Sequence, residues 1–86
     1  MADVDEILTR MRRSPRNIRF SDLCKVCDFY FGEPRRTGGS HRVYRMPWAG
    51  DPRINIQKEG DKAKIYQVRH ALKAIERLEV ERGKNE

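Results

Sequence analysis

One histidine of this sequence lies where a flexible turn meets a β-strand. His41 follows Gly38, Gly39 and Ser40, and from Arg42 onward basic and apolar residues alternate as they do in a strand. Glycine gives the backbone access to conformations that other residues avoid, and an imidazole exchanges a proton near neutral pH. His41 is therefore a candidate general acid or base, which the turn presents.

Four basic side chains are candidates to bind phosphate. Arg42 and Arg45 belong to the strand that His41 begins. Lys62 and Lys64 precede a predicted helix whose N-terminal dipole favours anions. The whole chain has a formal net charge of +6 and a pI near 9.7. Basic side chains gain affinity by releasing counterions from a phosphate backbone, so a nucleic acid is a candidate partner. The alternative is that the charge only keeps a small domain soluble.

RNA is a substrate that such a site could cleave, because its ribose 2′-hydroxyl is a built-in nucleophile. Cleavage needs a base for that hydroxyl, positive charge for the crowded phosphorus and a proton donor for the leaving oxygen. His41 can take the first or the last role, and the second proton-transfer group is open between Tyr44, Tyr66 and water. A surface histidine without catalytic function is the alternative for His41. His70, beside Ala71, is predicted to be partly buried and structural.

The two cysteines, Cys24 and Cys27, have the Cys-x-x-Cys spacing of a metal or redox site. A zinc site would need a second close pair of ligands, and His41 and His70 are too far apart in the sequence to form one. Both cysteines also fall inside an apolar helical pattern, not at the helix start that redox chemistry favours. We therefore predict buried free thiols, and we expect no metal and no cofactor.

The first residues of the chain contain no long apolar stretch. Residues Met1–Arg13 are charged and amphipathic, which predicts neither a signal peptide nor a membrane anchor. A cytoplasmic protein without membrane contact is therefore expected.

Hydrophobic periodicity and turn signals predict three helices and three strands. The expected helices are Ala2–Arg13, Ser21–Phe31 with Ser21 and Gly32 as caps, and a last helix from Lys64 or Ile65 to Gly83. The expected strands are Glu33–Thr37, His41–Met46 and Arg53–Gln57, followed by a polar turn over Glu59–Lys62. The apolar face of the last helix is predicted to consist of Ile65, Val68, Leu72, Ile75 and Leu78, opposite a solvated face with Arg69, Lys73, Glu76 and Arg77.

This order of elements predicts an α+β fold, in which helices cover one face of a three-stranded antiparallel sheet. We divide the chain into an N-terminal helical extension (residues 1–15), a main domain (16–82) and a charged tail (83–86). In the middle strand, the odd-numbered residues from His41 to Arg45 share one face and the even-numbered residues from Arg42 to Met46 share the other. The sequence leaves open which of the two faces is buried.

At these residues the chain resembles the HicA toxin family of bacterial toxin–antitoxin systems. The most specific part is Gly-Gly-Ser-His-Arg-Val-Tyr-Arg, residues 38–45, set between a short strand and an apolar strand. The resemblance covers Phe20–Leu78. The runs Phe31–Arg36, Pro47-Trp48 and Ala63–Arg69 are similar to one branch of the family, which has an extra N-terminal helix.

The resemblance implies a metal-independent endoribonuclease with a double-stranded-RNA-binding-like fold, which cleaves messenger RNA and arrests translation. It assigns the family's essential histidine to His41, presented by the turn that contains Gly39 and Ser40. It also implies that a partner antitoxin of the HicB family covers the active site and inhibits it. A non-catalytic RNA-binding module of the same fold is the alternative function.

Overall fold

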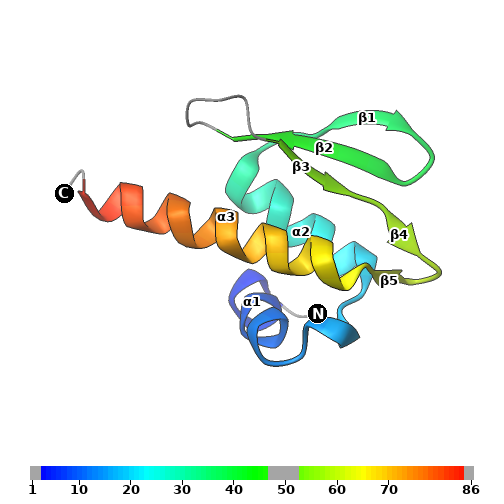
Figure 1. The fold of residues 1–86 in the computed structure, drawn as a ribbon, viewed down its shortest axis with the longest axis horizontal. Helices are drawn as coiled ribbons and strands as arrows, with labels where there is room; N and C mark the ends of the chain where they lie inside the picture. Colours follow the sequence, from blue (N-terminus) through cyan, green and yellow to red (C-terminus); the bar gives the residue numbers. More distant parts are fainter. Residues whose placement is uncertain (1–2, 47–52, 85–86) are drawn as a thin grey trace.

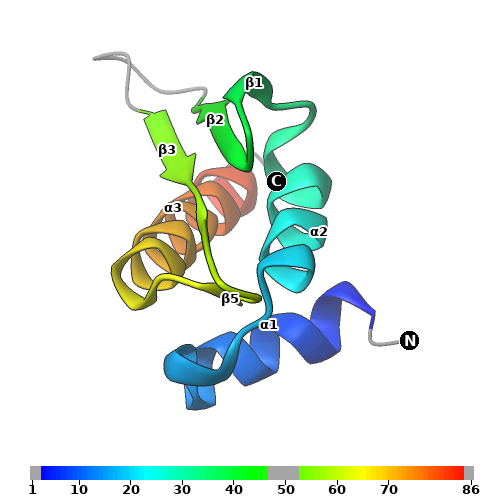
Figure 2. The ribbon, with the colours of Figure 1, turned by 90° about the vertical axis from the view of Figure 1, so that its right-hand side faces the viewer.

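Two layers of helices lie beneath a three-stranded antiparallel sheet (Figure 1). The computed structural model describes residues 3–46 and 53–84. Helices α2 (Phe20–Phe31) and α3 (Ile65–Lys84) cover one face of the sheet, and α1 (Val4–Arg13) packs against both of them on their far side (Figure 2). This arrangement confirms the α+β architecture that the sequence predicts, with helices on one face.

The N-terminal helix shares its core with the rest of the fold. The carboxylate of Asp3 caps α1 by accepting a hydrogen bond from the N–H of Glu6 at 2.8 Å. Three apolar side chains of α1 join the buried cluster formed with α2, α3 and the sheet: Ile7, Leu8 and Met11. Because these side chains are removed from water only by that packing, α1 forms part of the domain's own core.

Helix α2 begins one residue earlier than predicted. The proposed cap Ser21 lies inside the first turn, and Arg19 occupies the cap position without a side-chain hydrogen bond. The backbone N–H of Phe20 instead donates to the carbonyl of Asp61 at 3.0 Å, so a neighbouring segment satisfies a donor at this helix end. Gly32 ends the helix as predicted, and its φ of +83° is a conformation that favours glycine.

The sheet consists of β1 (Arg35–Gly38), β2 (His41–Arg45) and β3 (Arg53–Ile56), in this order and antiparallel. The predicted first strand began at Glu33 and included Pro34, but β1 begins only after the proline. Proline has no N–H for a strand ladder, which explains the later start. Trp48 lies outside the described residues.

The register of the sheet decides which face of β2 is buried. Tyr44 pairs with Ile54, and both side chains are buried against the helices, as is Met46. Val43 pairs with Asn55 on the opposite face, which we call the outer face. None of the described helices lies on the outer face (Figure 1). His41 and Arg45 therefore share an open surface.

The predicted polar turn after β3 is a small hairpin. Strands β4 (Lys58–Glu59) and β5 (Lys62–Ala63) pair around a turn that contains Gly60. The N–H of Ala63 donates to the carbonyl of Ile18 at 2.9 Å, which joins the hairpin to the segment between the 3-10 helix η1 (Pro15–Asn17) and α2. Two-residue strands carry no periodic pattern, so the sequence could not reveal them.

Helix α3 supplies the other wall of the core, begins at Ile65 as predicted and ends one residue later than predicted. Val68, Ala71 and Ile75 are fully buried, whereas Ile65 is 37% exposed because it lies in the first turn, at the rim of the packed face. The helix continues through Gly83 to Lys84. The four charged residues predicted to be solvated are exposed. None of the described helices, α3 included, has the length and apolar character needed to cross a membrane.

Candidate functional site

A tight turn between β1 and β2 presents His41 at one end of the sheet. Gly39 has a φ of +52° and Gly38 a φ of +151°, and both values lie in the range that favours glycine. A Cβ atom at either position would meet nothing within 4 Å, so backbone conformation, not space, requires glycine. His41 is the first residue of β2 and is half-buried. The turn therefore leaves part of the imidazole accessible from solvent.

Ser40 attaches this turn to a second segment. Its hydroxyl oxygen accepts a hydrogen bond from the backbone N–H of Lys58 at 3.2 Å, which joins the turn to β4. The pairing of β2 with β3 ends at Arg42 and Ile56, so His41 and Gln57 are the next residues along the two strands. The segment around His41 is thus held from both sides before any ligand binds.

Gln67 of α3 continues the connection toward a tyrosine. It is 5% exposed, and its side-chain oxygen accepts from the backbone N–H of Gln57 at 2.9 Å. Its amide nitrogen donates to the hydroxyl oxygen of Tyr66 at 3.3 Å. Because Tyr66 accepts this bond, its own proton can be donated to another group. Gln67 therefore connects the Tyr66 hydroxyl to the backbone of Gln57, the residue that follows β3.

The two tyrosines proposed for the second proton transfer differ sharply in position. Tyr44 is fully buried, and its hydroxyl donates to the Asp28 carboxylate at 2.6 Å. Burial and this hydrogen bond both raise the pKa of Tyr44 above its usual range. Tyr66 is 65% exposed. Tyr66 is therefore the candidate that can reach a substrate, and Tyr44 is a core residue.

The two arginines of β2 point to opposite faces of the sheet. Arg42 lies on the helix side, with its guanidinium carbon 5.9 Å from the ring centroid of Phe20. Burial raises the pKa of the nearby Cys24 thiol, and the positive charge of Arg42 offsets part of that rise. Arg45 is exposed on the outer face. Of these two arginines, both of which were predicted to bind phosphate, only Arg45 shares a face with His41.

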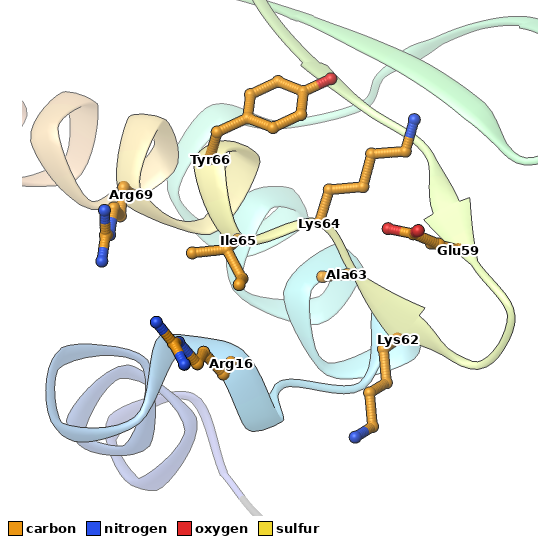
Figure 3. Close-up of a pocket in the computed structure, with 8 residues that line it drawn as sticks. All are labelled: Arg16, Glu59, Lys62, Ala63, Lys64, Ile65, Tyr66 and Arg69. Carbon is orange, nitrogen blue, oxygen red and sulfur yellow. The ribbon is translucent and has the colours of Figure 1, made fainter.

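The two lysines predicted to bind phosphate, Lys62 and Lys64, also point in different directions. Figure 3 shows the amine of Lys64 and the hydroxyl of Tyr66 extending toward the strands, while Lys62 extends the opposite way. The residues labelled there line an open hollow of about 490 Å³, in which Arg16 and Arg69 lie on the far side of Ile65. Lys64 is therefore the better placed of the two to assist a site at the His41 end of the sheet.

The remaining candidates for metal or acid–base chemistry fall elsewhere. His70 is exposed on α3, so the predicted partly buried packing role is wrong: the packed face of the helix is centred on Val68 and Ala71, and His70 points away from it. Cys24 and Cys27 are buried free thiols, as predicted. Within residues 3–46 and 53–84, no three histidine, cysteine, aspartate or glutamate side chains come together as a metal site.

Sequence reasoning missed Gln67 and the role of the backbone at Gln57. Gln67 stands one turn before Ala71 and next to Val68, so it occupies the buried side of α3. A polar residue on an apolar helix face needs a hydrogen-bond partner. That signal was present in the sequence, but it could not identify the partner, because the bend after β3 has no periodic pattern.

We expect Gln67→Leu to lower the free energy of unfolding by about 1 kcal/mol, because the N–H of Gln57 loses its acceptor. Urea unfolding measures this change. Gln57→Ala is the matched control, since the bond uses the Gln57 backbone and survives truncation of its side chain. Equal stability of Gln67→Leu and the unmodified protein would contradict the assigned role of Gln67.

Comparisons with known proteins add no identification: no family model, no curated protein and no solved structure matches this chain. The resemblance to HicA toxins therefore remains a hypothesis carried by residues 38–45 and the other runs that suggested it.

Proposed function

We propose that this protein is an endoribonuclease that cleaves messenger RNA with His41 as general base or general acid and without a metal ion. The observation that carries the proposal is the position of His41, half-buried at the end of a sheet face that none of the described helices covers. The proposal extends to a toxin that acts in the cytoplasm, arrests translation and is inhibited by a HicB-like antitoxin. Those extensions rest on the sequence resemblance alone.

The reaction can be written with groups of this chain. His41 accepts the proton of a ribose 2′-hydroxyl, and the 2′-oxygen forms a bond to phosphorus while the bond from phosphorus to the 5′-oxygen breaks. The leaving 5′-oxygen takes a proton from Tyr66 or from water. The products are a 2′,3′-cyclic phosphate and a 5′-hydroxyl. Lys64 is the cation that we propose stabilises the charge on the phosphorane. Arg45 lies about 13 Å from His41 along β2, so we propose that it binds the RNA backbone away from the reacting phosphorus.

A binding module that does not cut RNA is the second candidate. The order α2, β1, β2, β3, α3, with helices on one face, is the order expected of a double-stranded-RNA-binding-like fold, and such modules recognise shape, phosphates and 2′-hydroxyl groups. The two candidates share a basic surface and differ in whether His41 performs chemistry.

The deciding experiment incubates purified protein with end-labelled single-stranded RNA in excess EDTA. The proposal predicts discrete fragments that carry 2′,3′-cyclic phosphate ends, and no cut where the nucleotide on the 5′ side carries a 2′-deoxy sugar. RNA that stays intact while it binds with strong salt dependence would support the binding module instead. Co-expression of the protein encoded beside this one tests the antitoxin, because an inhibitory partner should suppress the fragments.

A further inference from the structure

We infer that Arg35, Arg45 and Arg53, which we call the arginine cluster, form a second phosphate-binding subsite for single-stranded RNA at the end of the outer face away from His41. The inference deepens the proposed function and rests on it for the identity of the anion. It differs from the sequence-based set of phosphate ligands, which contained Arg42 and lacked Arg35 and Arg53.

The strand register brings the three arginines together. Arg45 of β2 pairs directly with Arg53 of β3, so their side chains stand beside each other on the outer face. Arg35 of β1 pairs with Val43, which is two residues before Arg45 in β2, so Arg35 also lies on the outer face. All three side chains are exposed. Together with Phe31, Glu33 and Val43 they line a hollow of about 280 Å³.

Two like charges directly opposite each other on neighbouring strands destabilise a sheet. Arg45 and Arg53 are such a pair, so the sheet concentrates positive charge at this point of the outer face, which suits an anion. Glu33 supplies one negative charge in the same hollow, so three positive charges outnumber it. The guanidinium fork matches the oxygens of a phosphate diester better than a point charge does.

The spacing on the outer face fits a nucleic-acid strand better than a small anion. His41 and Arg45 are four residues apart in β2, which corresponds to about 13 Å along the strand, or roughly two extended nucleotides. Between them lie Val43, which offers an apolar platform for a base, and Asn55, which offers an amide. An RNA strand with one phosphate at His41 would thus place a later phosphate at the arginine cluster.

The test measures binding of an uncleavable oligonucleotide, so that it does not depend on catalysis. A fluorescein-labelled, fully 2′-O-methylated RNA of ten nucleotides is titrated with the protein at several salt concentrations, and anisotropy is recorded. The double variant Arg45→Gln/Arg53→Gln should bind about tenfold more weakly, and its salt slope should fall by about 0.7, since the one phosphate bound by the arginine cluster contributes about 0.7 on a single strand. Glu33→Gln should bind about twofold more tightly.

The matched control is Arg12→Gln/Arg13→Gln, which removes the same charge from the exposed end of α1. An equal loss of affinity in both double variants would overturn the inference, because net charge would then explain binding. Absent binding by the unmodified protein would overturn it as well. Arg45→Lys/Arg53→Lys keeps the charge without the fork, and it should recover only part of the affinity even if the glutamine variant folds poorly.

The two proposals can fail separately. RNA cleavage that depends on His41, together with binding that ignores the arginine cluster, would reject the subsite and keep the nuclease. Binding that depends on the arginine cluster without any cleavage would keep the subsite and reject the nuclease.

Discussion

The variant His41→Ala should cleave RNA about 10²- to 10⁴-fold more slowly than the unmodified protein, the range that a positioned acid or base contributes. The expected loss is this large because, among the described residues, His41 is the only histidine in the sheet, so no second imidazole can replace it. Single-turnover rates with excess protein measure it, since they exclude product release from the comparison.

The fold should tolerate this substitution. His41 is half-buried at the start of β2, so truncation removes little buried apolar surface, and circular dichroism should show a melting temperature within a few degrees of the original. His70→Ala is the matched control, because His70 is exposed on α3 and should change neither rate nor stability. Loss of cleavage in His70→Ala with retention in His41→Ala would reverse the assignment.

The variant Tyr66→Phe should slow cleavage by about 10²-fold if its hydroxyl protonates the leaving oxygen. The structure favours this tyrosine because its side chain is exposed and its hydroxyl accepts from Gln67 at 3.3 Å, which leaves its proton for donation. Phenylalanine keeps the ring and removes only the oxygen, so packing at the start of α3 is preserved. The single-turnover rate measures the effect.

Tyr30→Phe provides the control for a lost phenol. The hydroxyl of Tyr30 donates to Glu79 at 3.4 Å on the helix layer, away from the turn that carries His41, so this variant should cleave normally. If Tyr66→Phe also cleaves at the original rate, water is the proton donor and Tyr66 has no catalytic role.

The longer elements of the fold were predictable because their patterns are local. The helical periods of α1, α2 and α3 and the alternation in β3 appear directly in the sequence. The β4–β5 hairpin and the start of α2 were not predictable, because both depend on hydrogen bonds between distant segments, such as the bond from Phe20 to Asp61. Propensity alone favoured Ser21 as a cap, and tertiary pairing overrode it.

Part of the candidate site could be predicted because the pattern around His41 is also local in the sequence. A histidine after two glycines at the start of a strand can be found in the sequence, and the structure has it at that junction. The face to which Arg42 points could not be found, since it depends on whether Tyr44 or Val43 packs against the helices. The arginine cluster likewise becomes visible only when the register joins residues from three strands.

Rescue of His41→Ala by added imidazole tests the central claim most directly. If the ring of His41 moves the proton, free imidazole should restore cleavage in proportion to its concentration and should yield the fragments that the unmodified protein produces. A copurifying nuclease would not show this dependence. Undiminished cleavage by homogeneous His41→Ala without imidazole would contradict the account.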